Sequence, residues 1–414
     1  MKAVRRLAMV LAVVTAMVVP AAHASAAPRL VRIDTDAAGV TGVGGDARFA
    51  GLSTDGRYAL FTAATNDAMV PAPHRTSTRQ GFYVLRKDTR YGGVTLVSVT
   101  PAGRPLLVGW NSRTMRRDGA AYAYATDPYS GTAVVLYYRD PASGVREIAT
   151  LPSGWGAGDI ALSTDGHWLS WHAYNTLSAA DVLYRHDLRT GQTTTPLDCA
   201  DPSTGCYLST GPVVSDDGAV FALKYRPTPT DPILLAVLDP ATGQVRALPE
   251  GEEVEDYTIS GDGKWIFYSR GFGCPSCGGG RFELKKISTA PGAAPVLLRA
   301  WEDSVTWGVS LTSAGYTGEL VGYNRQTGVS GKYFAAARGY VHDQVTGIET
   351  LMPEPRPDVA YGGPPTVSSD SRLAVFGEQC LWATSCDPTG TYAVPLAELL
   401  PGRTWTYPRR VGAW

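Results

Sequence analysis

The chain has 414 residues, and its 37 basic and 38 acidic side chains give a formal net charge of -1. Because phosphate binding needs clustered Lys and Arg, this balanced and scattered charge excludes a nucleic-acid partner. With 44% hydrophobic and 18% charged residues the chain can bury a large core, and its 46 glycines and 29 prolines indicate many turns between short strands.

The first 26 residues have the three regions of a secretory signal peptide. Basic residues precede an apolar run from Leu7 to Val19, and small residues at positions 22, 24 and 26 follow as the cleavage region. The apolar run is too short to span a membrane. Arg5 and Arg6 leave the general and the twin-arginine export routes both open. Residues 27–414 are therefore predicted to be one exported domain, secreted or attached to the cell envelope, with no transmembrane segment.

A short phrase recurs along the predicted mature chain: a small residue, Ser, any residue, Asp and Gly, followed by alternating apolar residues. Its Asp positions or their equivalents are 55, 118, 165, 217, 262, 314 and 370, and successive positions lie 45 to 63 residues apart. The sixth copy lacks the Asp and the seventh lacks the Gly. A period near 50 residues built of short strands is typical of a β-propeller.

Each repeat predicts one blade of four antiparallel strands. The Asp-Gly pair forms a hairpin turn between the first and second strands, because Gly supplies the positive φ that a tight connection needs. Its Asp is expected to accept backbone N–H groups rather than to bind a metal. A second turn of the form Asp-x-x-Thr-Gly, as in 187–191, 239–243 and 343–347, follows the third strand.

Seven repeats predict an all-β fold, a seven-bladed β-propeller around a central channel. The N-terminal segment 29–34 is expected to pair with the last blade, since a closed ring removes exposed strand edges. Whether this segment replaces or joins a strand around residues 404–407 is left open.

The repeat resembles the TolB-type, WD40-like (PD40) propeller repeats of bacterial exported proteins. The resemblance rests on the Ser-x-Asp-Gly strand pairs at 53–56, 163–166, 215–218 and 260–263, and it covers the mature chain. It implies the fold and leaves the function open, because such propellers include binding scaffolds, accessory domains of peptidases and a few lyases.

Six cysteines fall into three close pairs, Cys199 with Cys206, Cys274 with Cys277 and Cys380 with Cys386. In an exported chain this pattern predicts three disulfides that each clamp one loop. A redox dithiol or half a zinc site is the alternative for the 274–277 pair. Three glycines follow that pair where a redox motif needs a helix N-terminus, and the other pairs lack zinc spacing.

The candidate binding residues lie on the loops opposite the Asp-Gly turns, around the expected channel mouth. Aromatic faces with interspersed charges are typical of surfaces that bind carbohydrate or peptide. Packing between blades is the alternative for each aromatic residue. The candidates are Trp110, Asn111, Arg113, Trp155, Asp159, His172, Asp256, Trp301, Asp303 and Tyr361.

No catalytic residue, metal ion or cofactor is predicted. The carboxylates of 252–256 could form a calcium loop, although a solvated acidic loop is the simpler interpretation. The sequence therefore predicts a monomeric, non-catalytic binding or scaffold protein that takes a protein or glycan of the cell envelope at the channel mouth. The alternative is a propeller lyase or hydrolase acting on an extracellular polysaccharide or lactone, which needs a convergent His, Arg and carboxylate set.

Overall fold

The computed structural model describes residues 28–40, 47–127, 132–175, 177–178, 180–201, 206–209, 212–228, 230–272, 281–302, 305–329, 332–353, 365–368, 370–377, 390–401 and 403. The predicted signal peptide lies outside these ranges. Within them the chain forms 29 strands, one 3-10 helix (Ala72–His74) and one short α-helix, α1 (Leu396–Leu399). Neither helix of the described chain is long and apolar enough to cross a membrane.

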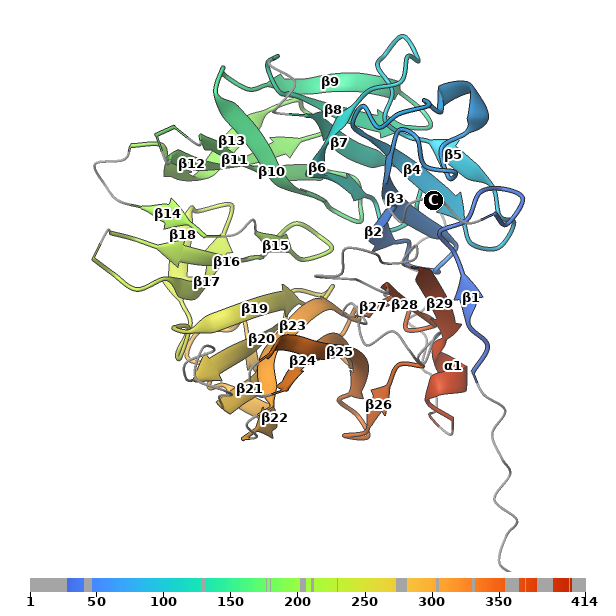
Figure 1. Ribbon diagram of the computed structural model, residues 1–414. Helices are drawn as coiled ribbons and strands as arrows, with labels where there is room; N and C mark the ends of the chain where they lie inside the picture. Colours follow the sequence, from blue (N-terminus) through green and yellow to red (C-terminus); the bar gives the residue numbers. More distant parts are fainter. Residues whose placement is uncertain are drawn as a thin grey trace, which may run out of the picture.

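The strands pair in chain order into antiparallel sheets that stand around a common centre (Figure 1). The first sheet has eight strands and consists of two four-stranded halves joined by one residue pair, Phe82 with Val108. Its halves are β2 (Arg48–Leu52), β3 (Tyr58–Ala64), β4 (Phe82–Asp88) and β5 (Val94–Leu96), then β6 (Val108–Met115), β7 (Tyr122–Thr126), β8 (Val135–Asp140) and β9 (Gly144–Thr150).

The next two sheets continue the same order. One contains β10 (Trp155–Leu162), β11 (Trp168–Asn175), β12 (Ala180–Asp187) and β13 (Thr193–Cys199). The following sheet has five strands because its first strand is divided in two; it contains β14 (Tyr207–Leu208), β15 (Val213–Val214), β16 (Phe221–Arg226), β17 (Leu234–Asp239) and β18 (Gln244–Ala247).

Three four-stranded sheets complete the described fold. They are β19 (Val254–Ile259), β20 (Trp265–Phe272), β21 (Arg281–Ser288) and β22 (Val296–Trp301); β23 (Thr306–Ala314), β24 (Leu320–Val329), β25 (Lys332–Asp343) and β26 (Glu349–Leu351); and β27 (Thr366–Val367), β28 (Leu373–Gly377) and β29 (Thr391–Pro395) with β1 (Val31–Arg32). The N-terminal strand β1 is thus the fourth strand of the sheet that holds the last repeat, with Val31 paired to Ala393.

The repeated Ser-x-Asp-Gly phrase forms the turn that the sequence predicts. In the first copy the Ser53 hydroxyl donates to Asp55 Oδ1 (2.8 Å), the same carboxylate accepts the Arg57 N–H, and Ser53 Oγ accepts the Tyr58 N–H. Gly56 has the positive φ of 68° that this turn requires. The same bonds recur at 163–168, 215–220 and 260–265.

The hydrophobic core lies between neighbouring sheets, because most central strands are buried on both faces. In β3, six of seven residues are buried. One core cluster joins residues of β7 and β8 to residues of β10 and β11, and Trp171 at its centre is 1% exposed and stacks on Tyr184 at 5.2 Å. A disulfide links Cys199 to Cys206, as the sequence predicts. The other four cysteines lie outside the described residues.

Candidate functional site

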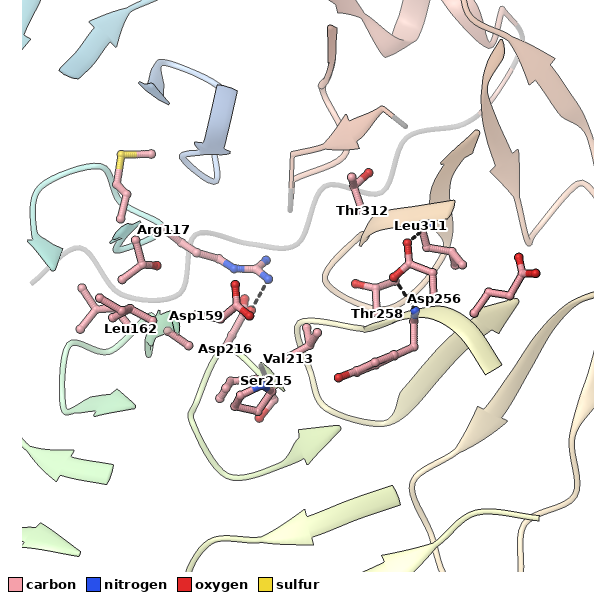
Figure 2. Close-up of a pocket in the computed structure, with 18 residues that line it drawn as sticks. Arg117, Asp159, Leu162, Val213, Ser215, Asp216, Asp256, Thr258, Leu311 and Thr312 are labelled. Atoms are coloured by element: carbon pink, nitrogen blue, oxygen red, sulfur yellow. Dashed lines mark hydrogen bonds and ion pairs between the residues drawn. The ribbon is translucent and has the colours of Figure 1, made fainter. Parts of the chain in front are cut away.

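A cavity of about 510 Å³ lies at the centre of the described sheets. Its walls come from the strands nearest the centre, β6, β10, β15, β19 and β23, and from the turns that follow β6 and β15. Figure 2 shows these side chains facing one another across the cavity. We call this space the central channel. Four of its described lining residues are carboxylates and one is a guanidinium: Asp159, Asp216, Glu255, Asp256 and Arg117.

Bulges in two lining strands place acidic residues in the central channel. The pairing of β10 with β11 shifts between Ala157 and Ile160, and that of β19 with β20 shifts between Val254 and Asp256. A bulge inserts an extra residue and re-aims the side chains beside it. Asp159 lies in the first bulge and Glu255 in the second. Both line the channel, and Asp159 is exposed there.

Glu255 is held between two glycines that leave room for its carboxylate. A Cβ on Gly271 would overlap Glu255 Oε1, and a Cβ on Gly308 would lie 3.8 Å from Oε2. The carboxylate accepts the Val309 N–H across the boundary between sheets. Burial raises the pKa of Glu255, and Lys224 opposes this rise. Burial lowers the pKa of Lys224, and the negative charges of Asp256 and Glu255 oppose this decrease.

Asp256 connects two sheets. Its Oδ1 accepts the Tyr257 N–H (2.9 Å) and its Oδ2 accepts the N–H of Leu311 in β23 (2.9 Å). Burial nevertheless raises the pKa of this carboxyl, and the two N–H donors and Lys224 limit the rise. Because both carboxylate oxygens accept backbone N–H groups, Asp256 holds β19 and β23 together in the channel wall.

At the turn end of the channel, Arg117 and Asp216 form an ion pair of 2.5 Å between Nη2 and Oδ1 (Figure 2). Each occupies the variable position of a Ser-x-Asp-Gly phrase or its equivalent, and the turn between them carries Thr164, whose N–H donates to the Asp216 carbonyl. The Asp216 side chain is 8% exposed. Burial raises the pKa of Asp216, and Arg117 opposes the rise.

The sequence does not single out Arg117 and Asp216. The variable position holds Thr54, Thr164 and Gly261 in other copies, so a charge there is the exception. Aligning the repeats therefore marks Arg117 and Asp216 as unusual. Its meaning depends on the turns meeting at the channel, which only the fold provides.

The candidate residues predicted from the sequence divide into four groups. Asp159 and Asp256 line the central channel. Arg113 lies near Asp159: burial lowers the pKa of Arg113 to about 10, and the Asp159 charge opposes this. Trp110 and Asn111 belong to β6, but their side chains lie outside the described part of the structure, as do Asp303 and Tyr361 entirely.

The remaining candidates do not line the central channel. His172 is buried, and its Nε2 lies 2.7 Å from Asp181 Oδ1. Trp155 packs partly buried against the core between β7–β8 and β10–β11. Trp301 is 7% exposed in the core cluster that includes Tyr323, in line with the alternative that aromatic residues pack between blades. Sequence position alone could not separate these residues from the channel.

The arrangement suits binding of a polar ligand by side chains from several sheets. No histidine is found among the described residues that line the channel. Across the described ranges, no three His, Cys, Asp or Glu side chains are grouped so that they could hold a metal ion.

No protein-family model and no curated protein matches the chain. Solved structures do match. An oligogalacturonate lyase in complex with manganese is 15% identical at a TM-score of 0.55, covering 89% of this chain and 98% of that chain. An oligogalacturonate lyase from Vibrio parahaemolyticus is 10% identical at 0.56 over the same shares. TolB from Acinetobacter baumannii is 15% identical at 0.43, covering 82% of this chain and 80% of that chain.

At these identities the likeness establishes the fold alone. The chain is an all-β propeller with several four-stranded antiparallel sheets, which confirms the predicted resemblance to TolB-type propellers at the level of the fold.

Proposed function

We propose that this protein is an exported, seven-bladed propeller that binds a ligand in its central channel. Seven blades result if the eight-stranded sheet counts as two and the β1–β29 pairing completes the last. Ring closure is supported by the Asp370 N–H, which donates to the Thr54 carbonyl (3.3 Å) and so joins the last repeat to the first. Export is supported by the Cys199–Cys206 disulfide, because disulfides persist mainly outside the cytosol.

The charge of the channel wall indicates a ligand with a cationic group, such as an amine or guanidinium. Arg117 balances Asp216, and backbone N–H groups occupy Asp256. Asp159, near Arg113, is an exposed carboxylate on a bulged strand, and Glu255, near Lys224, lies on another wall. The observation that supports the proposal most strongly is this bulged Asp159 inside a cavity of about 510 Å³, a volume typical of small-molecule sites.

The same charge argues against a strongly anionic ligand. The lyases with similar folds are named for oligogalacturonate, which carries a carboxylate on each sugar. The lining carries four carboxylates and one guanidinium, and carboxylates still outnumber cations when the neighbouring Arg113 and Lys224 are added. Such a wall repels an anionic chain, since like charges in a confined site cost several kcal/mol. We therefore propose that this channel takes a different class of ligand from the one for which those enzymes are named.

An enzymatic role is the second candidate, and one observation favours it. Glu255, which lines the cavity and has a raised pKa, lies near Lys224, which has a lowered pKa and whose Nζ is 3.4 Å from the Glu255 carbonyl oxygen. Groups shifted in opposite directions at one site are typical of general acid and base residues. Turnover of an extracellular polymer that is lost in Glu255→Gln, with folding intact, would favour this role over binding alone.

We expect the Asp159→Asn variant to bind cationic ligands at least tenfold more weakly than the wild type, because it removes a carboxylate exposed in the channel without changing the size of the side chain. Isothermal titration calorimetry with spermidine, glucosamine and arginine amide measures this, with glucose and galacturonate as the neutral and anionic comparisons. Glu147→Gln, on the outer strand β9, is the matched control. Equal affinity in Asp159→Asn, binding of none of the three cations, or tighter binding of galacturonate would contradict the proposal.

A further inference from the structure

A second cavity, of about 340 Å³, lies away from the central channel, between the two halves of the eight-stranded sheet. It shares no lining residue with the channel. Arg86 of β4 and Arg139 of β8 face it from opposite halves, together with the hydroxyl-bearing Thr95 and Tyr122. We call this space the inter-blade crevice. Its composition differs from that of the channel, because guanidiniums outnumber carboxylates.

Both guanidiniums are fixed in place by one of their nitrogens. Arg139 Nη1 donates to the carbonyl oxygens of Leu96 (2.9 Å) and Val97 (3.0 Å). Arg86 Nη1 donates to the Tyr122 hydroxyl (3.1 Å), and its guanidinium carbon lies 4.6 Å from the centre of the Tyr58 ring. Their other nitrogens make no hydrogen bond or ion pair with the described residues, so each side chain presents donors that a ligand can use.

Both arginines and Tyr122 line the same crevice. Tyr122 is 4% exposed, and burial raises the pKa of its hydroxyl. The Arg86 guanidinium donates to this hydroxyl (3.1 Å), and the charges of Arg86 and Arg139 both oppose the rise. Two positive charges that line one crevice repel each other unless an anion lies between them.

The one carboxylate of the crevice is already occupied. Asp140 Oδ1 accepts the N–H groups of Ala142 (2.7 Å) and Ser143 (2.8 Å), and Oδ2 accepts the Ser143 hydroxyl. These are the bonds of the Asp-x-x-Ser-Gly turn after β8. Asp140 therefore serves its own turn and is not an ion-pair partner for either arginine.

We infer that the inter-blade crevice binds the tetrahedral oxyanion of a small ligand, a phosphate or a sulfate group, between Arg86 and Arg139. Guanidiniums suit this ligand because their paired N–H groups match two oxygens of one oxyanion. The crevice exceeds a bare oxyanion in size, so it has room for the organic part of an ester. Phosphate and sulfate esters share this chemistry, and the measurement below distinguishes them.

Titration calorimetry on the wild-type protein with sodium phosphate, sodium sulfate and sodium chloride at matched ionic strength tests the inference. We expect saturable binding of phosphate or sulfate and none of chloride, and the tighter of the two identifies the group. Arg139→Gln and Arg86→Gln should each weaken that binding at least tenfold. Arg104→Gln, an exposed arginine outside the crevice, should leave it unchanged.

Arg139 also holds two backbone carbonyls, so Arg86→Gln decides the matter if Arg139→Gln fails to fold. Absence of saturable oxyanion binding in the wild type, or binding of equal strength in Arg86→Gln, would overturn the inference. The outcome is independent of the channel proposal, because Asp159→Asn should leave oxyanion binding unchanged.

Discussion

Replacing Lys87 with Met is expected to lower the free energy of unfolding by about 3 kcal/mol, because it removes a charge-assisted contact and leaves buried carbonyls without a donor. The Lys87 side chain in β4 is 3% exposed. Its Nζ donates to the Thr35 carbonyl (2.7 Å), to Thr35 Oγ1 (3.1 Å) and to the Asp36 carbonyl (2.7 Å). All three donors of the ammonium are thus satisfied by the segment that follows β1.

The position of this contact gives the substitution a second expected effect. β1 pairs with β29, so Lys87 joins the first sheet to the segment that completes the last. Urea unfolding measures the stability loss, and amide hydrogen exchange should show β1 and β29 losing protection before the other strands. Lys264→Met is the control, because its side chain is 74% exposed. An unchanged unfolding midpoint, or an equal loss in the control, would contradict this role.

Asp256→Asn is expected to cost about 2 kcal/mol at acidic pH and less as the pH rises. The amide offers one acceptor oxygen where the carboxyl group accepts from both Tyr257 and Leu311, so one buried N–H loses its partner. Urea unfolding of wild type and variant from pH 3 to pH 8 measures the difference.

The direction of this pH dependence follows from the raised pKa of Asp256. A carboxyl whose pKa is higher in the folded state binds its proton more tightly there than in the unfolded chain. The wild-type advantage is therefore largest below the unfolded pKa of roughly 3.9 and declines until the pH exceeds the folded pKa. A wild-type stability advantage that increases with pH would contradict this direction, because it would show that the N–H donors lower the pKa of Asp256 more than burial raises it.

The fold could be predicted because its signals are local. Each Ser-x-Asp-Gly turn satisfies its own hydrogen bonds within six residues, as at 53–58, so its sequence is enough to place it. The alternating strands on either side then define one four-stranded unit per repeat. Even the pairing of the N-terminal segment follows from the count of strands, since the last repeat lacks one of its own within the described residues.

The channel could be predicted only in part, because its residues depend on distant contacts. The bulges that turn Asp159 and Glu255 inward break the alternation on which strand prediction relies. His172 looks like a site residue in the sequence. The register of β11 with β12 instead brings it to Asp181, whose second oxygen accepts the Leu208 N–H of the next sheet (3.4 Å).

The two proposed sites differ in charge because they lie in different parts of the fold. The central channel takes its residues from the first strands and their turns, where carboxylates gather. The inter-blade crevice takes its residues from β4, β5, β7 and β8, where two arginines face each other. A ligand that carries both positive and negative groups could bind at either site. Probes with a single type of charge therefore distinguish the central channel from the inter-blade crevice.

The charge preference of the central channel is tested most directly by the reactivity of one cysteine placed on its wall. Thr114 lines the channel from β6, and its hydroxyl makes no hydrogen bond with another described residue. The reactivity of the thiol in Thr114→Cys therefore measures the electrostatic environment of the channel with little disturbance of its wall. Two methanethiosulfonate reagents of similar size, one with a trimethylammonium and one with a sulfonate group, give the ratio of rates, with the parent protein correcting for its native cysteines.

We expect the cationic reagent to react at least tenfold faster, and Asp159→Asn in the same background to bring the ratio towards one, because the Asp159 carboxylate is exposed in the channel and contributes to its negative field. A ratio at or below one in the Thr114→Cys protein, or a ratio that Asp159→Asn leaves unchanged, would contradict a channel built for cationic ligands.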